Sequence, residues 1–488
     1  MKILQASSEF HPYSKSGGLA DMVGSLSKAL AKAGHRVGVV TPLYKGIKEK
    51  YNPSKMDYFL EVPVGEKLVK GEVYILEPLP NFTIYFIDLP AYFYRSSLYL
   101  ENGRDFPDNA ERFIFLSKAV VHLARFLPWK PEVVHVHDWQ VGLVPALVLH
   151  QRVTQGWIDA PSTCLTIHNL AYQGSFPRSE YALTNLPWEF YHIDGIEFYG
   201  GMNCLKAAIS YADVITTVSP RYAREITTEL FGCGLDAALR KRQDDLVGIL
   251  NGVDYEEWNT DHNPYLKHSY NVENLEGKLT TKLDLQKEFG LPINPEIPLF
   301  GNISRLADQK GIDIQLGALE EMFSSDMQFV LLGSGAANYE RGYTKLAKRY
   351  PNKAGVVIGF DQALSHRIEA ACDFYLMPSR FEPCGLNQMY SLKYGSIPIV
   401  RVTGGLDDSV IDISEDVEKA NGIKFTDYSV RALAKSIRKA LSIYETPDLM
   451  GHYRENAMTA DFSWDRTMIE YERVYEALPL STNVDLKI

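Results

Sequence analysis

The sequence predicts an α/β protein built from two doubly wound parallel sheets. Two series of short apolar runs alternate with helical stretches, and the second series begins after Asn251-Gly252. Nearly continuous apolar runs are typical of parallel strands buried on both faces, and helices between them supply the crossovers. At 488 residues the chain also exceeds one core of ordinary size. We therefore expect two domains, at residues 1–250 and 251–464.

The expected strands follow directly from these runs. In the first domain they are Lys2–Ala6, Arg36–Thr41, Thr83–Asp88, Glu132–His137, Thr163–His168 and Val214–Val218. In the second domain they are Leu299–Ile303, Gln328–Leu332, Gly355–Ile358, Phe374–Met377 and Ile397–Val402. After the first strand, apolar residues recur at steps of three and four, which predicts an amphipathic helix: Leu19, Val23, Leu26, Leu30 and Ala33. Gly34 is expected to end that helix, and the polar stretch 258–270 is expected to be a linker.

Composition excludes several classes of protein. Fifty basic and 61 acidic residues give a formal charge of −11, which disfavours a nucleic-acid binder because such proteins rely on a basic surface. The longest apolar runs, such as Val141–Leu149, are far shorter than the ~20 residues of a membrane span. Five cysteines without a C-x-x-C pair indicate neither a disulfide framework nor a zinc site. The chain opens on a strand and carries Glu9 early, so we expect no leader segment and a cytoplasmic location.

The run Lys15-Ser16-Gly17-Gly18-Leu19 lies between the first expected strand and the first expected helix. Glycines at such a turn let backbone N–H groups approach an anion at the positive end of the helix, and Lys15 adds a point charge. An ordinary glycine-bearing turn of a βαβ unit explains the run equally well. Alone, it leaves both interpretations open.

Polar residues gather at the ends of two neighbouring strands in the first domain. His137-Asp138-Trp139 ends one strand and Thr166-Ile167-His168-Asn169 ends the next. Ligands of open parallel sheets bind outside the carboxyl ends of the strands, so this edge is a candidate site. For His137 itself we favour a structural hydrogen bond over catalysis. His135 and His137 share a strand face, but no third ligand is evident, so we predict no metal there.

Charged residues follow strands in the second domain as well. Arg305 and Lys310 lie five residues apart on one expected loop or helix start, where two cations could clamp a diphosphate. A solvated basic turn is the simpler explanation of that spacing. Gly333-Ser334-Gly335 also follows an expected strand, and a lone G-x-G is weak evidence that could mark a simple turn.

The segment Pro378–Leu386, followed by Thr403-Gly404-Gly405-Leu406, is more specific. It presents Glu382 at a strand end, between a proline that fixes the turn and a glycine that admits close backbone approach. A carboxylate there could hold sugar hydroxyls or a developing positive charge. Without the surrounding residues, a helix-cap carboxylate would be the default interpretation.

Seven motifs in order resemble the family of bacterial glycogen synthases and plant starch synthases. They are KSGGL at 15–19, HDW at 137–139, TIHN at 166–169, NGVD at 251–254, SRLADQKG at 304–311, EPCGL at 382–386 and TGGL at 403–406. The resemblance spans the chain from Lys2 to about Tyr475. It implies a GT-B fold, two Rossmann-like domains facing across a cleft, with a final helix at residues 465–488 packing back on the first domain. It implies transfer of glucose from a nucleotide-sugar donor to the non-reducing end of an α-1,4-glucan acceptor, with retention of configuration and no cofactor or metal.

The resemblance also implies roles for individual residues. The catalytic group would be Glu382, His168, Arg305, Lys310 and Asp138. The nucleotide sugar would contact Lys15, Gly17, Gly18, Asn251, Phe360, Cys384, Gly385, Leu386, Thr403 and Gly404. The acceptor side would include Glu9, Tyr99 and Trp139. ADP-glucose is the expected donor, and hinges are expected near Gly252 and before Trp464.

Some residues depart from the family pattern, and other functions stay open. Phe360 stands where many members have tyrosine, Val402 where an arginine often precedes TGGL, and Asn421-Gly422-Ile423 alters a usual Gly-x-Gly. The alternatives are a UDP-glucose-using transferase, a phosphorylase or hydrolase acting on α-glucan, and a non-catalytic carbohydrate-binding or scaffold protein. An NAD dehydrogenase is disfavoured because neither sheet opens with G-x-G-x-x-G.

Overall fold

The computed structural model describes residues 1–478 and divides them into two compact units. Unit 1 contains Met1–Val218, Ala223–Gly252 and the segment from Trp464 to the last described residue. Unit 2 contains Val253–Ser463 and, in addition, the short segment Ser219–Tyr222. The predicted boundary between the domains was at residue 250, and the observed one lies after Gly252. Unit 2 also includes four residues from the first half of the chain, which was not predicted. The predicted final helix at 465–488 lies partly outside the described residues.

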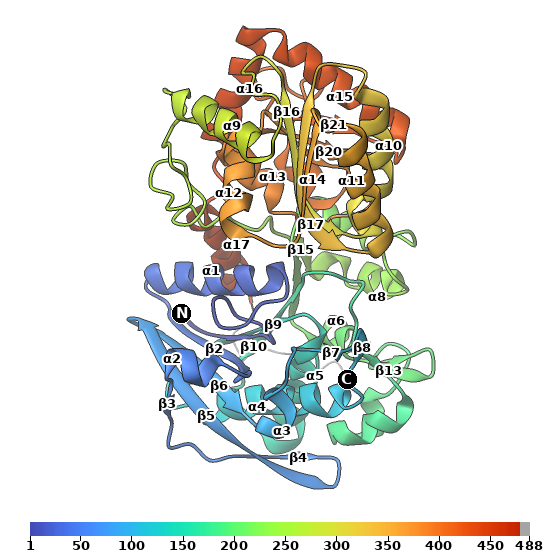
Figure 1. The fold of residues 1–488 in the computed structure, drawn as a ribbon. Coiled ribbons are helices and arrows are strands. Elements are labelled where there is room, and N and C mark those ends of the chain that lie inside the picture. Colours follow the sequence, from blue (N-terminus) through green and yellow to red (C-terminus); the bar gives the residue numbers. More distant parts are fainter. Residues whose placement is uncertain (479–488) are drawn as a thin grey trace. The chain divides into compact units, whose positions relative to one another are not determined.

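The large sheet of unit 1 is parallel over most of its width (Figure 1). Its strand order is β15-β14-β10-β9-β1-β2-β6-β5-β3, and β4 pairs with β5. The bounds are β1 Lys2–Ala6, β2 Arg36–Pro42, β3 Ser54–Lys55, β4 Leu60–Val64, β5 Lys67–Leu79, β6 Phe82–Asp88, β9 Val133–His137, β10 Ser162–Ile167, β14 Val214–Thr217 and β15 Leu246–Gly248. The strand order reverses between β1 and β9, as in a doubly wound sheet. Loops that follow these two strands therefore meet at one edge.

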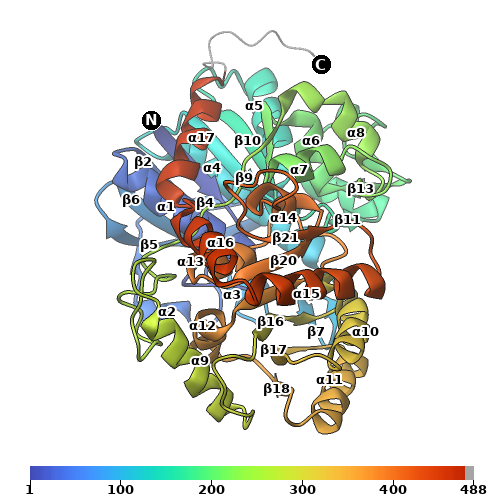
Figure 2. The same ribbon diagram turned by 90° about the horizontal axis from the view of Figure 1, so that it is seen from above.

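Helices cover this sheet on both faces. The helices of unit 1 are α1 Gly18–Lys32, α2 Ile47–Tyr51, α3 Pro90–Phe93, α4 Asn109–Phe126, α5 Val144–Gln155, α6 Cys204–Tyr211, α8 Asp236–Lys241 and α17 Trp464–Glu476. Helix α7 Pro220–Glu225 is divided, because its residues up to Tyr222 belong to unit 2. Short 3-10 helices are η1 Trp139–Val141, η2 Arg178–Thr184, η3 Trp188–Phe190 and η4 Gln243–Asp245, and small sheets are formed by β7 Leu100–Glu101 with β8 Arg104–Asp105 and by β11 Ser175–Phe176, β12 Glu197–Phe198 and β13 Gly201–Asn203. Figure 2 shows α17 beside α1, which it contacts. The last helix of the described chain thus returns to unit 1.

Unit 2 is built on a fully parallel sheet with the order β18-β17-β16-β19-β20-β21. The strands are β16 Leu299–Leu306, β17 Gln328–Gly335, β18 Ala354–Ile358, β19 Phe374–Met377, β20 Ile397–Arg401 and β21 Ile423–Phe425. In chain order this is the 3-2-1-4-5-6 arrangement of a Rossmann sheet, and it reverses between β16 and β19. The helices are α9 Glu276–Glu288, η5 Asp308–Lys310, α10 Ile312–Met322, α11 Ala337–Arg349, α12 Gln362–Ala371, α13 Asn387–Lys393, α14 Gly404–Ser409, α15 Val430–Tyr444 and α16 Pro447–Thr459. Figure 1 shows α9 and α12 on one face of the sheet and α10, α11 and α15 on the other.

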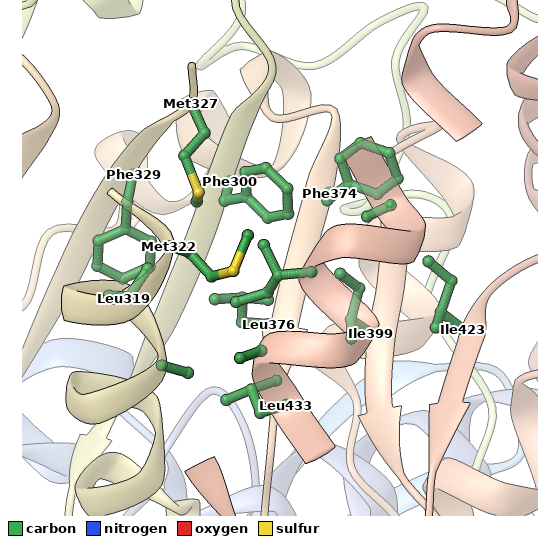
Figure 3. Packing of buried hydrophobic residues seen from close by; sticks show 14 of the residues in the cluster. Phe300, Leu319, Met322, Met327, Phe329, Phe374, Leu376, Ile399, Ile423 and Leu433 are labelled. Atoms are coloured by element: carbon green, nitrogen blue, oxygen red, sulfur yellow. The ribbon is translucent and has the colours of Figure 1, made fainter. Parts of the chain in front are cut away.

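The largest core cluster of unit 2 fills the space between the sheet and α10, α11 and α15. Phe300 of β16 and Phe374 of β19 stack with ring centroids 5.0 Å apart, and Leu319 and Met322 of α10 pack from the helix side (Figure 3). Each Å² of apolar surface that this cluster removes from water stabilises the fold by roughly 25 cal/mol. Packing against these helices therefore fixes the strands whose ends carry the polar residues.

The prediction of two doubly wound sheets is confirmed, and every expected strand is present within a few residues of its predicted bounds. Three expectations were wrong in detail. Arg305 lies inside β16 rather than on the following loop, because the strand continues to Leu306. Gly333-Ser334-Gly335 belongs to β17 and is not a turn, and Ala33 lies after α1, where it is exposed. Strands β3, β4, β5, β15 and β21 of the two large sheets were not predicted.

In the described part of the chain, no helix is both long enough and apolar enough to cross a membrane.

Replacing Phe374 tests the core of unit 2. Phe374→Ala removes a fully buried ring that stacks on Phe300, so we expect a loss of about 3–5 kcal/mol in the free energy of unfolding of unit 2. Urea denaturation followed by circular dichroism measures it. The matched control is Ile293→Ala, whose side chain is exposed and should shift the free energy by less than about 0.5 kcal/mol. Equal effects of the two variants would contradict this account of the core.

Candidate functional site

The strand-order reversal of unit 2 brings two polar loops together. β16 and β19 are hydrogen-bonded neighbours, so the segments that follow them begin at the same edge of the sheet. The first segment forms η5, which ends at Lys310. The second runs through Pro378–Leu386 before α13, and we call it the Glu382 turn. This edge is where ligands of doubly wound sheets bind.

Lys310 and Glu382 form an ion pair at this edge. The Nζ of Lys310 lies 2.6 Å from Oε2 of Glu382, and the Ser379 hydroxyl donates to the same oxygen at 3.1 Å. Glu382 is only 7% exposed, and a carboxylate buried to that extent needs such partners. Its second oxygen, Oε1, accepts no hydrogen bond from any residue within 1–478. The carboxylate therefore keeps one acceptor for a ligand.

Backbone contacts fix the Glu382 turn on two sides. The N–H of Gly405, in the first turn of α14, donates to the carbonyl oxygens of Glu382 at 3.2 Å and Pro383 at 3.1 Å. Gly404 has φ +44°, and a Cβ there would lie 1.9 Å from the Glu382 carbonyl oxygen. On the other side, a Cβ on Gly311 would lie 2.0 Å from the Pro378 carbonyl oxygen. Glycine is required at both positions because no side chain fits between these backbones.

The remaining predicted residues of the Glu382 turn lie at the starts of helices. Cys384 is buried, and its carbonyl accepts from the Gln388 side chain at 3.1 Å, as does that of Gly385 at 2.9 Å. Gly385 has φ +71°, the left-handed conformation that favours glycine. Leu386 precedes α13 and Thr403 precedes α14. Six predicted residues thus lie on two short segments at one sheet edge: Glu382, Cys384, Gly385, Leu386, Thr403 and Gly404.

Arg305 and Phe360 are the exposed members of the predicted set in unit 2. Arg305 is exposed near the end of β16, and its guanidinium makes no ion pair or hydrogen bond with residues 1–478. Phe360 follows β18 and is 87% exposed, so its ring is free to stack on a flat ligand. Arg305 lies near the carboxyl end of β16 and Phe360 follows β18 of the same parallel sheet, so both lie toward the edge that carries Lys310 and Glu382.

In unit 1, Glu9 follows β1 and is buried in a network of hydroxyl groups. Its Oε1 accepts from the Ser16 hydroxyl at 2.5 Å and from the Tyr99 hydroxyl at 2.6 Å, and Oε2 accepts from the Ser16 N–H. The hydroxyl of Ser8 lies 2.7 Å from that of Tyr99. Burial raises the pKa of Tyr99, and the nearby Glu9 carboxylate adds to the effect. Both oxygens of Glu9 are occupied, so it holds the loop before α1 in place.

The loop at Lys15 is exposed and ends at α1. Gly17 is the N-terminal cap residue, with no side-chain cap, and Gly18 is the first helical residue. Lys15 Nζ lies 2.8 Å from Asp21 Oδ1, with the Lys15 side chain 48% exposed. An ion pair this exposed contributes only about 0–1 kcal/mol, so an anion of higher charge can compete for Lys15. Asp21 lies six residues after Lys15, and no sequence pattern indicated that the two form a pair.

Asp138 and His168 lie together at the ends of β9 and β10. Asp138 Oδ1 accepts from the His168 N–H at 2.7 Å. Burial, with a smaller effect of the nearby Glu9 charge, raises the pKa of Asp138 to about 7, although backbone N–H donors act in the opposite direction. Burial lowers the pKa of His168 to about 3, so its ring is neutral at physiological pH. This edge of unit 1 therefore presents a neutral imidazole beside a carboxyl group that titrates near neutrality.

His168 lies next to a series of buried side chains that are joined by hydrogen bonds. His137 lies 3.1 Å from His168 and 2.7 Å from Oε1 of Gln5, using one ring nitrogen for each. His135 contacts the Tyr475 hydroxyl of α17 at 2.8 Å and Thr166 at 2.6 Å. Both rings of this strand face are used in structural hydrogen bonds, the interpretation favoured for His137. Within residues 1–478, no group of three or more His, Cys, Asp or Glu side chains is arranged to hold a metal ion.

Two predicted residues stand apart from these groups. Asn251 is buried in unit 1, and its side-chain oxygen has no hydrogen-bond partner among the described residues. Trp139 packs edge-on against Phe113 at 5.1 Å and Phe176 at 5.7 Å. The ring also lies so close to Gly174 that a Cβ there would be 2.2 Å away. Trp139 is therefore held firmly, and most of its surface is used inside unit 1.

Sequence reasoning missed two kinds of residue at these edges. Ser379 lies inside the motif that identified Glu382, but nothing in the pattern indicated its bond to the carboxylate. Ser219 follows β14 and donates to the Pro383 carbonyl at 2.7 Å. Its position at a strand end was the one available signal.

Two family models match the chain. Residues 2–241 match the starch synthase catalytic domain, and residues 285–457 match glycosyl transferases group 1. Among curated proteins, a glycogen synthase of Anaeromyxobacter dehalogenans (strain 2CP-1) is 43% identical, covering 98% of this chain and 99% of its own length. A glycogen synthase of Opitutus terrae is also 43% identical, covering 97% and 99%.

Solved structures give the same result for the fold. The catalytic domain of starch synthase IV from Arabidopsis thaliana, bound to ADP and acarbose, superposes with a TM-score of 0.88 at 33% identity, covering 97% of this chain and 98% of its own. A sucrose-phosphate synthase from Thermosynechococcus elongatus has a TM-score of 0.62 at 17% identity, with 98% of each chain covered. The second likeness is one of fold alone.

The pKa of Asp138 predicts a pH dependence of stability. Between its ordinary value of 3.8 and about 7, the folded protein binds more protons at this carboxyl than the unfolded chain does. Its contribution is thus complete below about pH 4 and is lost as the pH rises through 7. Asp138→Asn keeps the acceptor for the His168 N–H and removes the titration, so the variant should gain stability relative to the wild type by roughly 1 kcal/mol per unit between pH 5 and 7.

Urea unfolding of both proteins at pH 5, 6 and 7 measures this difference. Buried histidines titrate in both proteins alike, so they cancel in the comparison. A difference that stays constant over the range would show that Asp138 is ionised throughout.

Proposed function

The chain belongs to the family of bacterial glycogen synthases and plant starch synthases, and we propose ADP-glucose as its donor. The protein is a glycosyltransferase of the GT-B fold. It transfers glucose from a nucleotide sugar to the non-reducing end of an α-1,4-glucan with retention of configuration. The ADP in the starch synthase IV structure supports adenine as the donor base. We also propose a cytoplasmic location, supported by the five cysteines, which form no disulfide within residues 1–478.

The observation that carries the assignment of the site is the Lys310–Glu382 pair at the reversal point of unit 2. A bond between glucose and a diphosphate places a sugar beside a group of high negative charge. Glu382 offers a free oxygen for a sugar hydroxyl, and Lys310 and Arg305 offer cations for the phosphates. The two requirements of the donor are thus met by side chains that follow adjacent strands.

Charge development explains why the cations matter for the rate. As the bond from the anomeric carbon to the phosphate oxygen breaks, negative charge grows on that oxygen. Preorganised cations stabilise such charge more strongly than water does, because they need no reorganisation when the bond breaks. We assign this role to Arg305 and Lys310, with Phe360 stacking on the base and the Cys384–Gly385 segment lining the sugar.

In unit 1 we propose donor contacts for Lys15, Gly17 and Gly18, at the start of α1. His168 and Asn251 would hold glucose hydroxyls, since Nδ1 of the neutral His168 ring can accept a hydrogen bond and the Asn251 oxygen has an unused acceptor. Asp138, Glu9, Tyr99 and Trp139 would lie on the acceptor side. These roles rest on the family resemblance together with the local geometry of each residue.

For the chemical step we propose attack from the face that the diphosphate leaves. The acceptor hydroxyl forms the new bond to the anomeric carbon, the bond to the phosphate oxygen breaks, and the hydroxyl proton passes to that oxygen. The leaving phosphate is then the base, and configuration is retained. Double displacement would instead use Glu382 as the nucleophile. The ion pair with Lys310 at 2.6 Å disfavours this, because a neutralised carboxylate is a weaker nucleophile.

The decisive experiment offers ADP-glucose and UDP-glucose separately with a maltooligosaccharide and measures the released nucleotide and the lengthened product. We expect release of ADP coupled to chain extension with an α linkage. Faster use of UDP-glucose would overturn the donor assignment. Free glucose without extension would indicate a hydrolase, and glucose 1-phosphate formed from glucan and phosphate would indicate a phosphorylase.

Arg305 provides the sharpest mutational test. Because Arg305 forms no ion pair within the described chain, Arg305→Ala should leave the fold intact and lower kcat by about 100-fold to 1,000-fold. Arg305→Lys keeps the charge and should recover part of the rate. The matched control is Arg349→Ala, an exposed arginine at the end of α11. A near-normal kcat in Arg305→Ala would remove this residue from the mechanism.

A further inference from the structure

We propose that Ser219, assisted by Arg221, is a positioning residue that sets the placement of the Glu382 turn against α14. The proposal rests on the function assigned above to that turn. Its starting point is the division of the chain, because Ser219–Tyr222 is the one stretch before Val253 that belongs to unit 2. Four residues following β14 thus form part of the unit that carries Glu382, Lys310 and Arg305.

Ser219 contacts the Glu382 turn through its hydroxyl group. The side chain is completely buried, and its Oγ donates to the Pro383 carbonyl oxygen at 2.7 Å. The same Oγ accepts from the Tyr222 N–H at 3.1 Å, so the hydroxyl is used as both donor and acceptor. Pro383 directly follows Glu382 in the chain. A shift of its carbonyl therefore changes the direction in which the Glu382 side chain leaves the backbone.

Arg221 contacts α14 through two carboxylates. Its backbone N–H donates to Asp408 Oδ2 at 2.6 Å, and its guanidinium lies 3.4 Å from Asp407 Oδ2. The other oxygen of Asp407 accepts from Lys424 at 2.8 Å. Helix α14 follows the Thr403-Gly404 segment, so Arg221 and Lys424 fix the helix whose first turn lies against the Glu382 turn.

The two sets of contacts meet at the Pro383 carbonyl. This oxygen accepts from Ser219 and also from the N–H of Gly405 in α14, at 3.1 Å. A carbonyl oxygen has two lone pairs, so both are used. One bond ties the turn to α14, and the other ties it to the segment that itself holds α14. Ser219 and Arg221 therefore close a loop of contacts around the residue next to Glu382.

The rate of a chemical step is sensitive to contacts that position a reacting group. A displacement of about 1 Å in a positioning group can cost about 100-fold in rate, although no contact to the substrate is lost. Ser219 contacts neither Lys310 nor the free oxygen of Glu382 in the described structure. Its removal should thus affect kcat through the placement of the turn, with little effect on donor binding.

The test is Ser219→Ala, which deletes the donor to Pro383. We expect kcat for glucosyl transfer from ADP-glucose to fall about 10-fold to 100-fold, with KM for ADP-glucose within about threefold of the wild type. Hydrogen exchange measured by mass spectrometry should become faster in peptides covering 382–386 and 403–409, and stay unchanged in peptides from β17 and β18. Ser219→Cys keeps the packing with a weaker donor, and an intermediate result is expected.

The matched control is Ser436→Ala, which removes a buried hydroxyl that donates within α15 to the Ala432 carbonyl. It should leave kcat and exchange in 382–386 as in the wild type. Unchanged exchange in both peptides for Ser219→Ala and Ser219→Cys would overturn the proposal, as would a kcat within twofold of the wild type. If Ser219→Ala does not fold, the exchange rates and the kcat of Ser219→Cys alone test the proposal.

The hydrogen-exchange measurement separates this proposal from the proposed function. Should the wild-type protein fail to transfer glucose from ADP-glucose while Ser219→Ala still loosens 382–386 and 403–409, the donor assignment is wrong and the positioning role stands. If the wild type transfers glucose normally and the variants show no faster exchange in these peptides, the donor assignment stands and the positioning role of Ser219 is wrong.

Discussion

The ion pair between Lys310 and Glu382 is the interaction on which the geometry of unit 2 depends. It joins the segments after β16 and β19, the two strands between which the sheet order reverses. A carboxylate buried beside backbone carbonyls would be strongly disfavoured without a cation, so the pair fixes the spacing of these segments. The Arg380 N–H adds a second link by donating to the Gln309 carbonyl at 2.8 Å. Gly311 then allows the two backbones to pack closely enough for both links to form.

The strand pattern of this fold could be predicted because parallel strands are buried on both faces. Runs such as Phe374–Met377 were predicted with their observed bounds for that reason. The same criterion missed β5, which spans Lys67–Leu79 and mixes charged with apolar residues. That strand pairs antiparallel at the margin of the sheet with one side toward water, so charged residues interrupt it and leave only the short apolar run Val73–Leu76. Two-residue strands such as β3 leave no periodic signal at all.

The candidate site could be predicted as far as single residues at strand ends, but not as far as their partners. Spacing along the chain indicated Glu382 and Lys310 separately, 72 residues apart, yet nothing in the sequence paired them. Asp21 as the partner of Lys15 was missed because it lies on the first turn of α1, six residues on. Ser219 was missed because a single hydrogen bond from a hydroxyl to a backbone carbonyl leaves no pattern in the amino-acid sequence. Such partners depend on how strands order themselves in the sheet, which local sequence does not specify.

The two lysines of the predicted phosphate site differ in what their partners allow. Lys15 is paired with Asp21 at the surface, where water screens the attraction, so a diphosphate can take Lys15 over at little cost. Lys310 is paired with a carboxylate that is almost fully buried and cannot be left without a cation. A lysine ammonium has three donors, and Glu382 uses one of them. Lys310 can therefore hold Glu382 and a phosphate oxygen together, which links the residue proposed to hold the sugar directly to the group that leaves.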